Sequence, residues 1–569
     1  MATTGPTVEA STRPESDVAL LRLLIEAQNL DAAGVAEAAN AALGKDWRGR
    51  DWVAAQLFPS AAADGDAALA SFYELSGSVD AFRVEQIAWE ITYRLKDTGA
   101  FDSVKPDLPT GTYQLDIDDE EEGIFGGKEV DLPETDAPNF TWALKNIRVP
   151  EAWELEPKPG GKRRGEGSVV GHPDTGYTNH PQVSLDALDR ERDRDFVADP
   201  EDDDAEDPLD RASFPLETFP AHGTGTSSVI VGRGEGLLTG VAPMAILIPI
   251  RAVRSVVQVM DGQVAKAVDH ARRMGAHVIS MSLGGLGFHG LEAAIDRAVE
   301  EGVIVLAAAG NHLPGRFVCY PARYRNCLAV AASNARDGQW GGSSHGRAVA
   351  IAAPGTGVWV ARWNLDARPP VPDKIGRSRG TSHAVAHVAG VAALWLAHHG
   401  RQSLLDRYGP ENMSAAFRHV VRQTCRTPAD WNTKKWGAGI IDAAALLSLD
   451  PLPSRDEIEA GEEAVEAEMT SLDVVLESVP DVENEVLVQR LTSLLGSGDE
   501  EAAGGDPSRD TLDRYSDELA YLMLEKREVR DALAGDWEAE SAGPSGPQVM
   551  GRALRRTASK SLLQKMGLA

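Results

Sequence analysis

The sequence predicts an α/β fold in which helices cover both faces of a parallel sheet. Between residues 139 and 449, short and fully apolar runs alternate with helix-like stretches, which is typical of parallel strands buried on both faces. After residue 450 these runs stop and Glu-rich helical segments follow. The two observations predict one α/β domain over 139–449 with mainly helical regions before and after it. The runs are SVVG at 168–171, ILIPI at 246–250, HVISMSL at 277–283, VIVLAAAG at 303–310, LAVAA at 328–332 and VAIAAP at 349–354.

Length and composition narrow the class of protein. A chain of 569 residues with 43% hydrophobic residues is long enough for several globular domains. It contains no run of 18 apolar residues, so no membrane-spanning helix is expected. The first apolar cluster follows acidic residues and is not a secretory leader, and 3 cysteines do not make a disulfide framework. We therefore expect a cytoplasmic protein.

Charge is distributed unevenly along the chain. The formal net charge is −31, which argues against binding of nucleic acid through its phosphates. Two stretches supply most of it: 186–210 holds 13 acidic and 3 basic residues, and 451–550 holds 26 acidic and 7 basic residues. The tail 551–569 is basic. Such a tail binds anionic lipid, nucleic acid or the acidic segments of its own chain, and we favour the last.

The first hundred residues carry mostly helical signals. Leucines at helical spacing over 16–28 follow a candidate N-cap, Ser16, and an Ala-rich helix is expected over 31–43. Residues 82–97 form an amphipathic pattern, and FDSV at 101–104 is strand-like. The resulting division is a helical or prodomain-like N-terminal region at 1–109, an acidic linker at 110–138, the α/β domain at 139–449, an acidic helical region at 450–550 and a basic tail at 551–569.

Four polar residues stand at positions where an α/β sheet places its chemistry. Ser382 opens an apolar helix, where free backbone N–H groups face an incoming oxygen. A serine there is most often only an N-cap. However, Asp174 and Asn311 each follow an apolar strand, and His222 lies in AHGTGT. A serine nucleophile needs an imidazole base and a carboxylate that orients it, and an amide can donate to an oxyanion.

The order of these four motifs resembles that of the subtilisin-like serine proteases, the subtilases. The resemblance covers about residues 140–448 and extends to further motifs: GVAP at 240–243, SMSLGG at 280–285, YPA at 320–322 and WGAG at 436–439. It implies a serine endopeptidase that works through an acyl-enzyme. In that scheme Asp174 orients His222, His222 is the general base, Ser382 is the nucleophile and Asn311 lies in the oxyanion hole.

The resemblance also implies a substrate-binding site. Ser282, Leu283 and Gly284 would pair with the substrate backbone as an added strand. The first specificity pocket would be walled by these residues and by Ala308, Ala309 and Gly310, with Cys319 on its floor. A buried thiol there predicts a shallow pocket that prefers Leu, Met or Ala to Phe and Tyr.

The chain departs from the family pattern at several positions. Pro173 precedes the Asp and His383 follows the Ser, where relatives usually have a hydrophobic residue and Met. We expect His172, His312 and His383 to be neighbours of the site rather than proton carriers, and His387 to be structural.

No cofactor is expected to be required. Arg233 lies in the loop that carries the usual tight calcium site of the family, where a cation opposes Ca²⁺. The acidic stretch 186–210 could bind calcium instead, but it shows no spaced ligand loop.

Several alternatives remain open at this stage. The N-terminal region is either a cleaved prodomain or an adaptor. The helix over 83–96, the strand-like 101–104 and the turn 105–109 look like the last half of the family's prodomain. The residues before them are mostly helical, which does not match its usual βαββαβ order. The enzyme is either general or a processing protease with one dedicated protein or peptide substrate. A regulatory partner could bind the terminal regions. The alternative from another class is an inactive subtilase fold that binds proteins.

Overall fold

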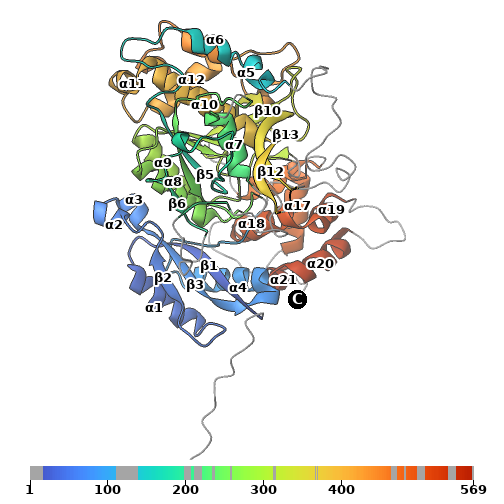
Figure 1. Ribbon diagram of the computed structural model, residues 1–569. Coiled ribbons are helices and arrows are strands. Elements are labelled where there is room, and N and C mark those ends of the chain that lie inside the picture. Colours follow the sequence, from blue (N-terminus) through green and yellow to red (C-terminus); the bar gives the residue numbers. More distant parts are fainter. Residues whose placement is uncertain are drawn as a thin grey trace, which may run out of the picture. The chain divides into compact units, whose positions relative to one another are not determined.

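The computed structural model divides the chain into two compact units (Figure 1). One unit holds residues 1–108, 489–518 and 535–569, and the other holds 109–488 and 519–534. The structure describes residues 17–110, 139–197, 207–210, 221–233, 237–256, 259–311, 316–365, 367, 369–462, 471–479, 482–495, 507–535 and 546–566.

The larger unit is built on a seven-stranded sheet with strand order β11-β10-β9-β8-β5-β7-β6. Every pairing in it is parallel. Helices α7 (His222–Val231) and α10 (Thr381–His399) pack together in one layer on the sheet, and α8 (Asp261–Arg273) and α9 (His289–Glu300) pack together in another. This architecture confirms the predicted α/β fold with helices on both faces. The strands are β5 (Val169–Asp174), β6 (Arg194–Asp195), β7 (Ile246–Arg251), β8 (Val278–Met281), β9 (Ile304–Ala308), β10 (Leu328–Ser333) and β11 (Val349–Pro354).

Further helices and a hairpin surround the sheet in this unit. The hairpin of β12 (Val358–Asn364) and β13 (Val371–Ser378) leads directly into the central helix α10. The helices are α5 (Trp142–Asn146), α6 (Val149–Glu154), α7 (His222–Val231), α8 (Asp261–Arg273), α9 (His289–Glu300), α10 (Thr381–His399), α11 (Arg401–Tyr408), α12 (Met413–Thr424), α13 (Thr433–Trp436) and α14 (Ala443–Ser448).

The composition of helix α10 follows from its position in the core. All of its residues are buried, so it has no solvent face and shows no amphipathic pattern. Close packing requires small side chains: a Cβ added at Gly390 would lie 2.4 Å from the Cβ of Val241. The helix is thereby held firmly, and its N-terminal residues are positioned by the core.

The N-terminal residues form a second sheet. Strands β1 (Val18–Glu26), β2 (Val53–Gln56), β3 (Phe72–Asp80) and β4 (Ser103–Pro106) pair antiparallel in the order β2-β3-β1-β4. The helices are α1 (Ala32–Leu43), the short α2 (Ala61–Asp64) and α3 (Ala67–Ala70), and α4 (Val84–Lys96). Apart from α2 and α3, the order is βαββαβ.

The helix predicted over 16–28 is therefore wrong. This segment is the inner strand β1, which pairs with β3 on one side and β4 on the other. A short apolar run fits helical and strand spacing alike, and here the pairing with distant strands decides between them. The predictions over 31–43, 82–97 and 101–104 are confirmed by α1, α4 and β4.

The C-terminal region is helical, as expected. Its helices are α15 (Arg455–Glu462), α16 (Ser471–Glu477), α17 (Asn484–Leu495), α18 (Pro507–Glu525), α19 (Arg527–Ala534), α20 (Gly546–Thr557) and α21 (Lys560–Lys565). In the described part of the chain, no helix has both the length and the apolar character needed to cross a membrane.

Candidate active site

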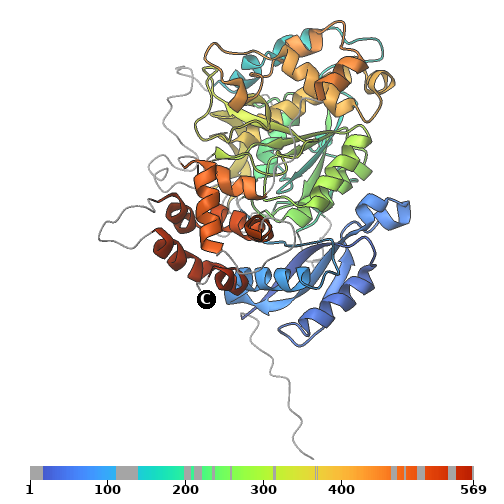
Figure 2. The ribbon, with the colours of Figure 1, turned by 180° about the vertical axis from the view of Figure 1, so that it is seen from behind.

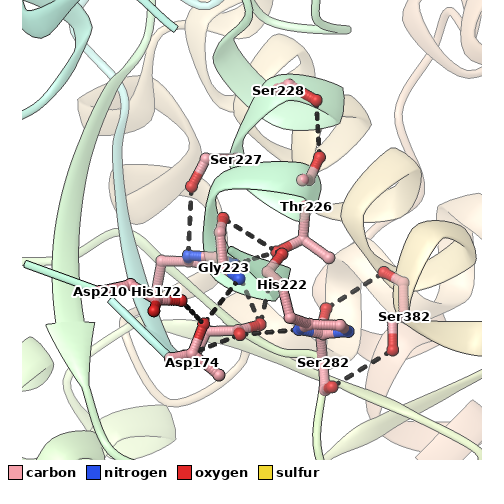
Figure 3. A network of polar contacts seen from close by, with 12 residues as sticks. His172, Asp174, Asp210, His222, Gly223, Thr226, Ser227, Ser228, Ser282 and Ser382 are labelled. Atoms are coloured by element: carbon pink, nitrogen blue, oxygen red, sulfur yellow. Dashed lines mark hydrogen bonds and ion pairs between the residues drawn. The ribbon is translucent and has the colours of Figure 1, made fainter. Parts of the chain in front are cut away.

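A buried carboxylate and an imidazole meet at the end of strand β5. Asp174 is the last residue of β5 and is fully buried, and His222 is the first residue of α7. The Nδ1 atom of His222 lies 2.7 Å from Oδ1 of Asp174, which also accepts a hydrogen bond from the Thr175 amide at 2.7 Å (Figure 3). The end of β5 and the start of α7 thus fix the positions of Asp174 and His222.

The other carboxylate oxygen of Asp174 is also held. Thr226 donates its hydroxyl to Oδ2 at 3.3 Å, and the buried His172 places Nε2 at 3.7 Å from the same oxygen. Burial alone would raise the pKa of Asp174, but the charge and hydrogen bond of His222 hold it below its usual value. Burial lowers the pKa of His172. The site therefore keeps an ionised carboxylate beside a neutral second histidine.

Ser382 is the second residue of α10 and lies on the far side of His222 from Asp174 (Figure 3). Its hydroxyl donates to the backbone carbonyl of Ser282 at 3.2 Å, and the Ser282 hydroxyl donates to the Ser382 carbonyl at 3.1 Å. Ser382 and His222 line the same pocket. In this conformation the Ser382 hydroxyl faces Ser282, so it must turn to reach the imidazole.

Asn311 lies beside the start of α10. Its Oδ1 atom accepts hydrogen bonds from the Thr381 amide at 2.8 Å and from the Thr381 hydroxyl at 3.0 Å. These two bonds fix the orientation of the side-chain amide and leave its Nδ2 group to donate elsewhere. Asn311 lines the pocket together with Ser382, so an oxygen bound there would meet an N–H donor.

The structure brings most of the predicted substrate-binding residues into one pocket. Of that set, Gly284 and Ala309 are outside the lining. Sequence analysis did not predict four of the lining residues, which are Val256, Ser378, Arg379 and Thr381. Only the last three had a nearby signal, because they lie next to Ser382 in the sequence. The lining is His222, Val256, Ser282, Leu283, Ala308, Gly310, Asn311, Cys319, Ser378, Arg379, Thr381, Ser382 and His383.

Cys319 belongs to this lining and is almost fully buried. Its Sγ atom lies 3.4 Å from the carbonyl oxygen of Ala309 and 3.7 Å from that of Ala308. Burial raises the pKa of the thiol to about 12, so it is protonated at neutral pH. His312, expected to be a neighbour of the site, is outside the described residues.

Two further histidines are neutral neighbours of the site. His383 lines the pocket, and burial, with a contribution from the charge of His222, lowers its pKa to about 3. Burial lowers the pKa of His387 to about 4, and its Nδ1 atom lies 2.7 Å from the carbonyl oxygen of His383. Neither histidine carries a proton charge at neutral pH.

An extended segment of the same chain pairs beside the pocket. Thr110 and Val259 form an antiparallel bridge in which each amide donates to the other's carbonyl at 2.9 Å. A Cβ at Gly285 would lie 3.1 Å from the Thr110 hydroxyl. Thr110 therefore lies between Val259 and the end of the SMSLGG motif. Sequence analysis missed this pairing.

The loop expected to lack calcium is held by its arginine. The Arg233 guanidinium donates through Nε to the Pro243 carbonyl, through Nη2 to the Ala245 carbonyl at 2.8 Å and through Nη1 to the Asp186 carbonyl at 3.4 Å. A cation bonded to three carbonyl oxygens does not fit a calcium site there.

Comparisons with known proteins point to one protein family. The model of the subtilase family matches residues 165–439. Thermitase of Thermoactinomyces vulgaris is 32% identical over 292 residues, which cover 50% of this chain and 90% of thermitase.

The chain belongs to the subtilase family. It is accordingly a serine endopeptidase.

Other relatives match a similar share of the chain. Subtilisin Savinase of Lederbergia lenta is 26% identical, with 54% of this chain and 99% of that protein covered. Two solved structures also match. A protease of Pseudoalteromonas arctica is 27% identical, with a TM-score of 0.44 and coverage of 55% of this chain and 98% of that one. MycP1 of Mycobacterium smegmatis is 26% identical, with a TM-score of 0.42 and coverage of 56% and 87%.

Proposed function

We propose that this subtilase hydrolyses peptide bonds with Ser382 as nucleophile, His222 as general base and Asp174 as the residue that orients His222. The observation that carries the proposal is the 2.7 Å contact between His222 Nδ1 and the buried Asp174. It fixes the tautomer in which Nε2 is free to accept the Ser382 proton. Because Asp174 stays ionised, it also stabilises the imidazolium that forms.

The reaction follows from these positions. The Ser382 hydroxyl turns from the Ser282 carbonyl toward His222, gives up its proton and attacks the peptide carbonyl. Asn311 Nδ2 and the Ser382 backbone amide donate to the oxyanion. The imidazolium then returns its proton to the leaving amine, and water hydrolyses the acyl-enzyme by the same route.

Substrate recognition is proposed at two places. The segment Ser282–Gly284 pairs with an extended substrate, as Thr110 pairs with Val259 in the same unit. Cys319 closes the floor of the first specificity pocket, which supports a preference for Leu, Met or Ala over Phe and Tyr.

The N-terminal region is proposed to be a prodomain-like regulator, with the linker 110–138 as the place of cleavage. Two observations support this over the adaptor alternative: the βαββαβ order of the N-terminal sheet and the substrate-like pairing of Thr110. Apart from Thr110, the linker is outside the described residues. A dedicated processing role, a cytoplasmic location and activity without bound calcium remain predictions.

Covalent labelling tests the proposed function. A fluorophosphonate probe should label the parent protein at Ser382, while Ser382→Ala should stay unlabelled. Ser280→Ala is a matched control, because Ser280 is a buried serine of β8 outside the pocket lining. An unlabelled parent protein would favour the binding-module alternative.

A further inference from the structure

Helix α4 of the N-terminal sheet region packs against segments from the C-terminal part of the chain. The first unit groups residues 17–108, which we call the N-terminal domain, with 489–495, 507–518 and 546–566, which we call the C-terminal layer. Helix α21 of the layer packs against α4 of the domain, and the two run side by side in both views (Figures 1 and 2).

Helix α4 has two buried faces. A helix that only covers a sheet buries one stripe, here represented by Ala88, Ile91 and Leu95. Trp89 and Tyr93, about 100° to 140° further round the helix, are buried as well. The second stripe is therefore available to hold another element.

Residues of that second stripe contact the C-terminal layer along the length of α4. Gln86 donates its side-chain amide to the Arg556 carbonyl at 3.3 Å, and Glu90 accepts from the Lys560 amide at 3.4 Å. At the helix C-terminus, Asp97 pairs with Arg514 at 2.6 Å.

The centre of this contact is a buried polar cluster. Glu518 of the layer is fully buried. Its carboxylate accepts hydrogen bonds from the Tyr93 hydroxyl at 2.8 Å, the Ser559 amide at 2.6 Å and the Ser559 hydroxyl at 2.9 Å. The rings of Tyr93 and Tyr515 lie 4.9 Å apart, with the Arg514 guanidinium 5.5 Å from the Tyr93 ring. Such a cluster needs both sides, since removal of either leaves buried polar atoms unpaired.

We propose that the C-terminal layer is the binding surface for the N-terminal domain and retains it after the linker is cut. The layer is joined to the catalytic domain through the continuous chain 450–534, whereas the N-terminal domain is joined to it through 110–138. A cut in 110–138 removes the second connection and leaves the first. The inference rests on the proposed function only for the place of the cut.

An engineered cut tests the retention without relying on self-processing. A recognition sequence for an unrelated, site-specific protease is inserted between residues 120 and 130 of the Ser382→Ala protein. After cleavage, gel filtration and mass spectrometry should find the N-terminal fragment with the rest of the chain. Its release after dilution gives a dissociation rate.

Substitutions at the contact between the C-terminal layer and α4 test which residues hold the N-terminal fragment. Arg514→Ala combined with Tyr515→Ala should speed its release about 10- to 100-fold, because a buried aromatic pair and two polar contacts are lost. Asp513→Ala, an exposed neighbour on the same helix, should leave the rate unchanged. Tyr93→Phe, which removes only the hydroxyl that Glu518 accepts, should speed release severalfold even if the double variant loses helix content in circular dichroism.

Three results would overturn the inference. They are immediate loss of the fragment from the parent, equal rates for the parent and a folded double variant, and no effect of Tyr93→Phe. Self-processing is measured separately, as the intact mass of the parent against that of Ser382→Ala without the inserted sequence. Trimming confined to the parent supports the proposed cleavage, and identical intact masses in an active preparation contradict it, whatever the retention experiment shows.

Discussion

Asp174 lies in the unit that holds the parallel sheet, the catalytic unit, and Glu518 lies in the unit that holds the N-terminal sheet, the N-terminal unit. Both are fully buried carboxylates that accept hydrogen bonds, yet their pKa values move in opposite directions. Burial raises both, but at Asp174 the facing His222 can carry a positive charge and brings the pKa below its usual value. At Glu518 the donors are the neutral Tyr93 and Ser559, and burial raises the pKa to about 7. Burial of a carboxylate is thus compatible with catalysis or with a structural contact, and the partner decides which.

The largest expected effect separates the two carboxylates by activity. Asp174→Asn should lower kcat by about 10⁴-fold, because the imidazole loses the partner that orients it and stabilises its charge. Glu518→Gln should leave kcat unchanged. Steady-state hydrolysis of a peptide substrate measures both. Equal losses in the two variants would show that the comparison is mistaken.

The second largest loss of activity is expected at Asn311, whose side-chain Nδ2 group is left to donate into the pocket. Asn311→Ala should lower kcat by about 10²–10³-fold with little change in KM, since the amide acts on the developing oxyanion. Full kcat in this variant would remove Asn311 from the oxyanion hole. Asn326→Ala is a control, because the Asn326 amide donates to Asp296 and Asn326 is outside the pocket lining.

The stability of the N-terminal unit should depend on pH through Glu518. Its pKa is about 7 in the folded protein and close to 4.5 in the unfolded chain. Between these values the folded state binds more protons, so the free energy of unfolding falls as pH rises from about 4.5 to 7 and then levels off. A shift of this size corresponds to roughly 3 kcal/mol.

Melting of the parent, Glu518→Gln and Asp513→Asn across this pH range checks that expectation. Glu518→Gln should lose most of the slope and be more stable than the parent above pH 7. Asp513→Asn, at an exposed position of the same helix, should keep the slope. A parent whose stability rises from pH 4.5 to 7 would contradict the assignment to Glu518.

A smaller effect is expected at Cys319. Cys319→Gly should shift the preferred residue before the cut toward Phe and Tyr, by about 1–3 kcal/mol at most, because it deepens an apolar pocket. Profiling a peptide library with parent and variant measures the change. The matched variant is Cys327→Ala, a buried thiol outside the pocket lining. Unchanged profiles for Cys319→Gly would show that this thiol does not set specificity.

The smallest effect is expected from a chelator. The Arg233 guanidinium donates to the carbonyl oxygens of Pro243, Ala245 and Asp186, so EDTA should change the melting temperature little. A drop of many degrees would indicate a calcium site elsewhere, and the acidic stretch 186–210 would be examined first.

Sequence reasoning predicted the catalytic unit well and the N-terminal unit poorly. Apolar strands buried on both faces have a distinctive pattern, and Asp174, His222, Asn311 and Ser382 stand in motifs at the ends of such elements. The leucines of 16–28 carry no comparable signal, because a nine-residue strand and a short helix bury similar apolar residues.

The sequence by itself determined the parallel α/β fold, the family and most of the side chains that line the candidate site, since each depends on local pattern and motif. Only the tertiary structure decided that 18–26 is a strand, that Thr110 pairs with Val259 and that Glu518 meets Tyr93 and Ser559. Thr110 and Val259 are 149 residues apart, and Tyr93 and Glu518 are 425 apart. Contacts over such separations arise from packing of whole elements, and no local pattern of residues encodes them.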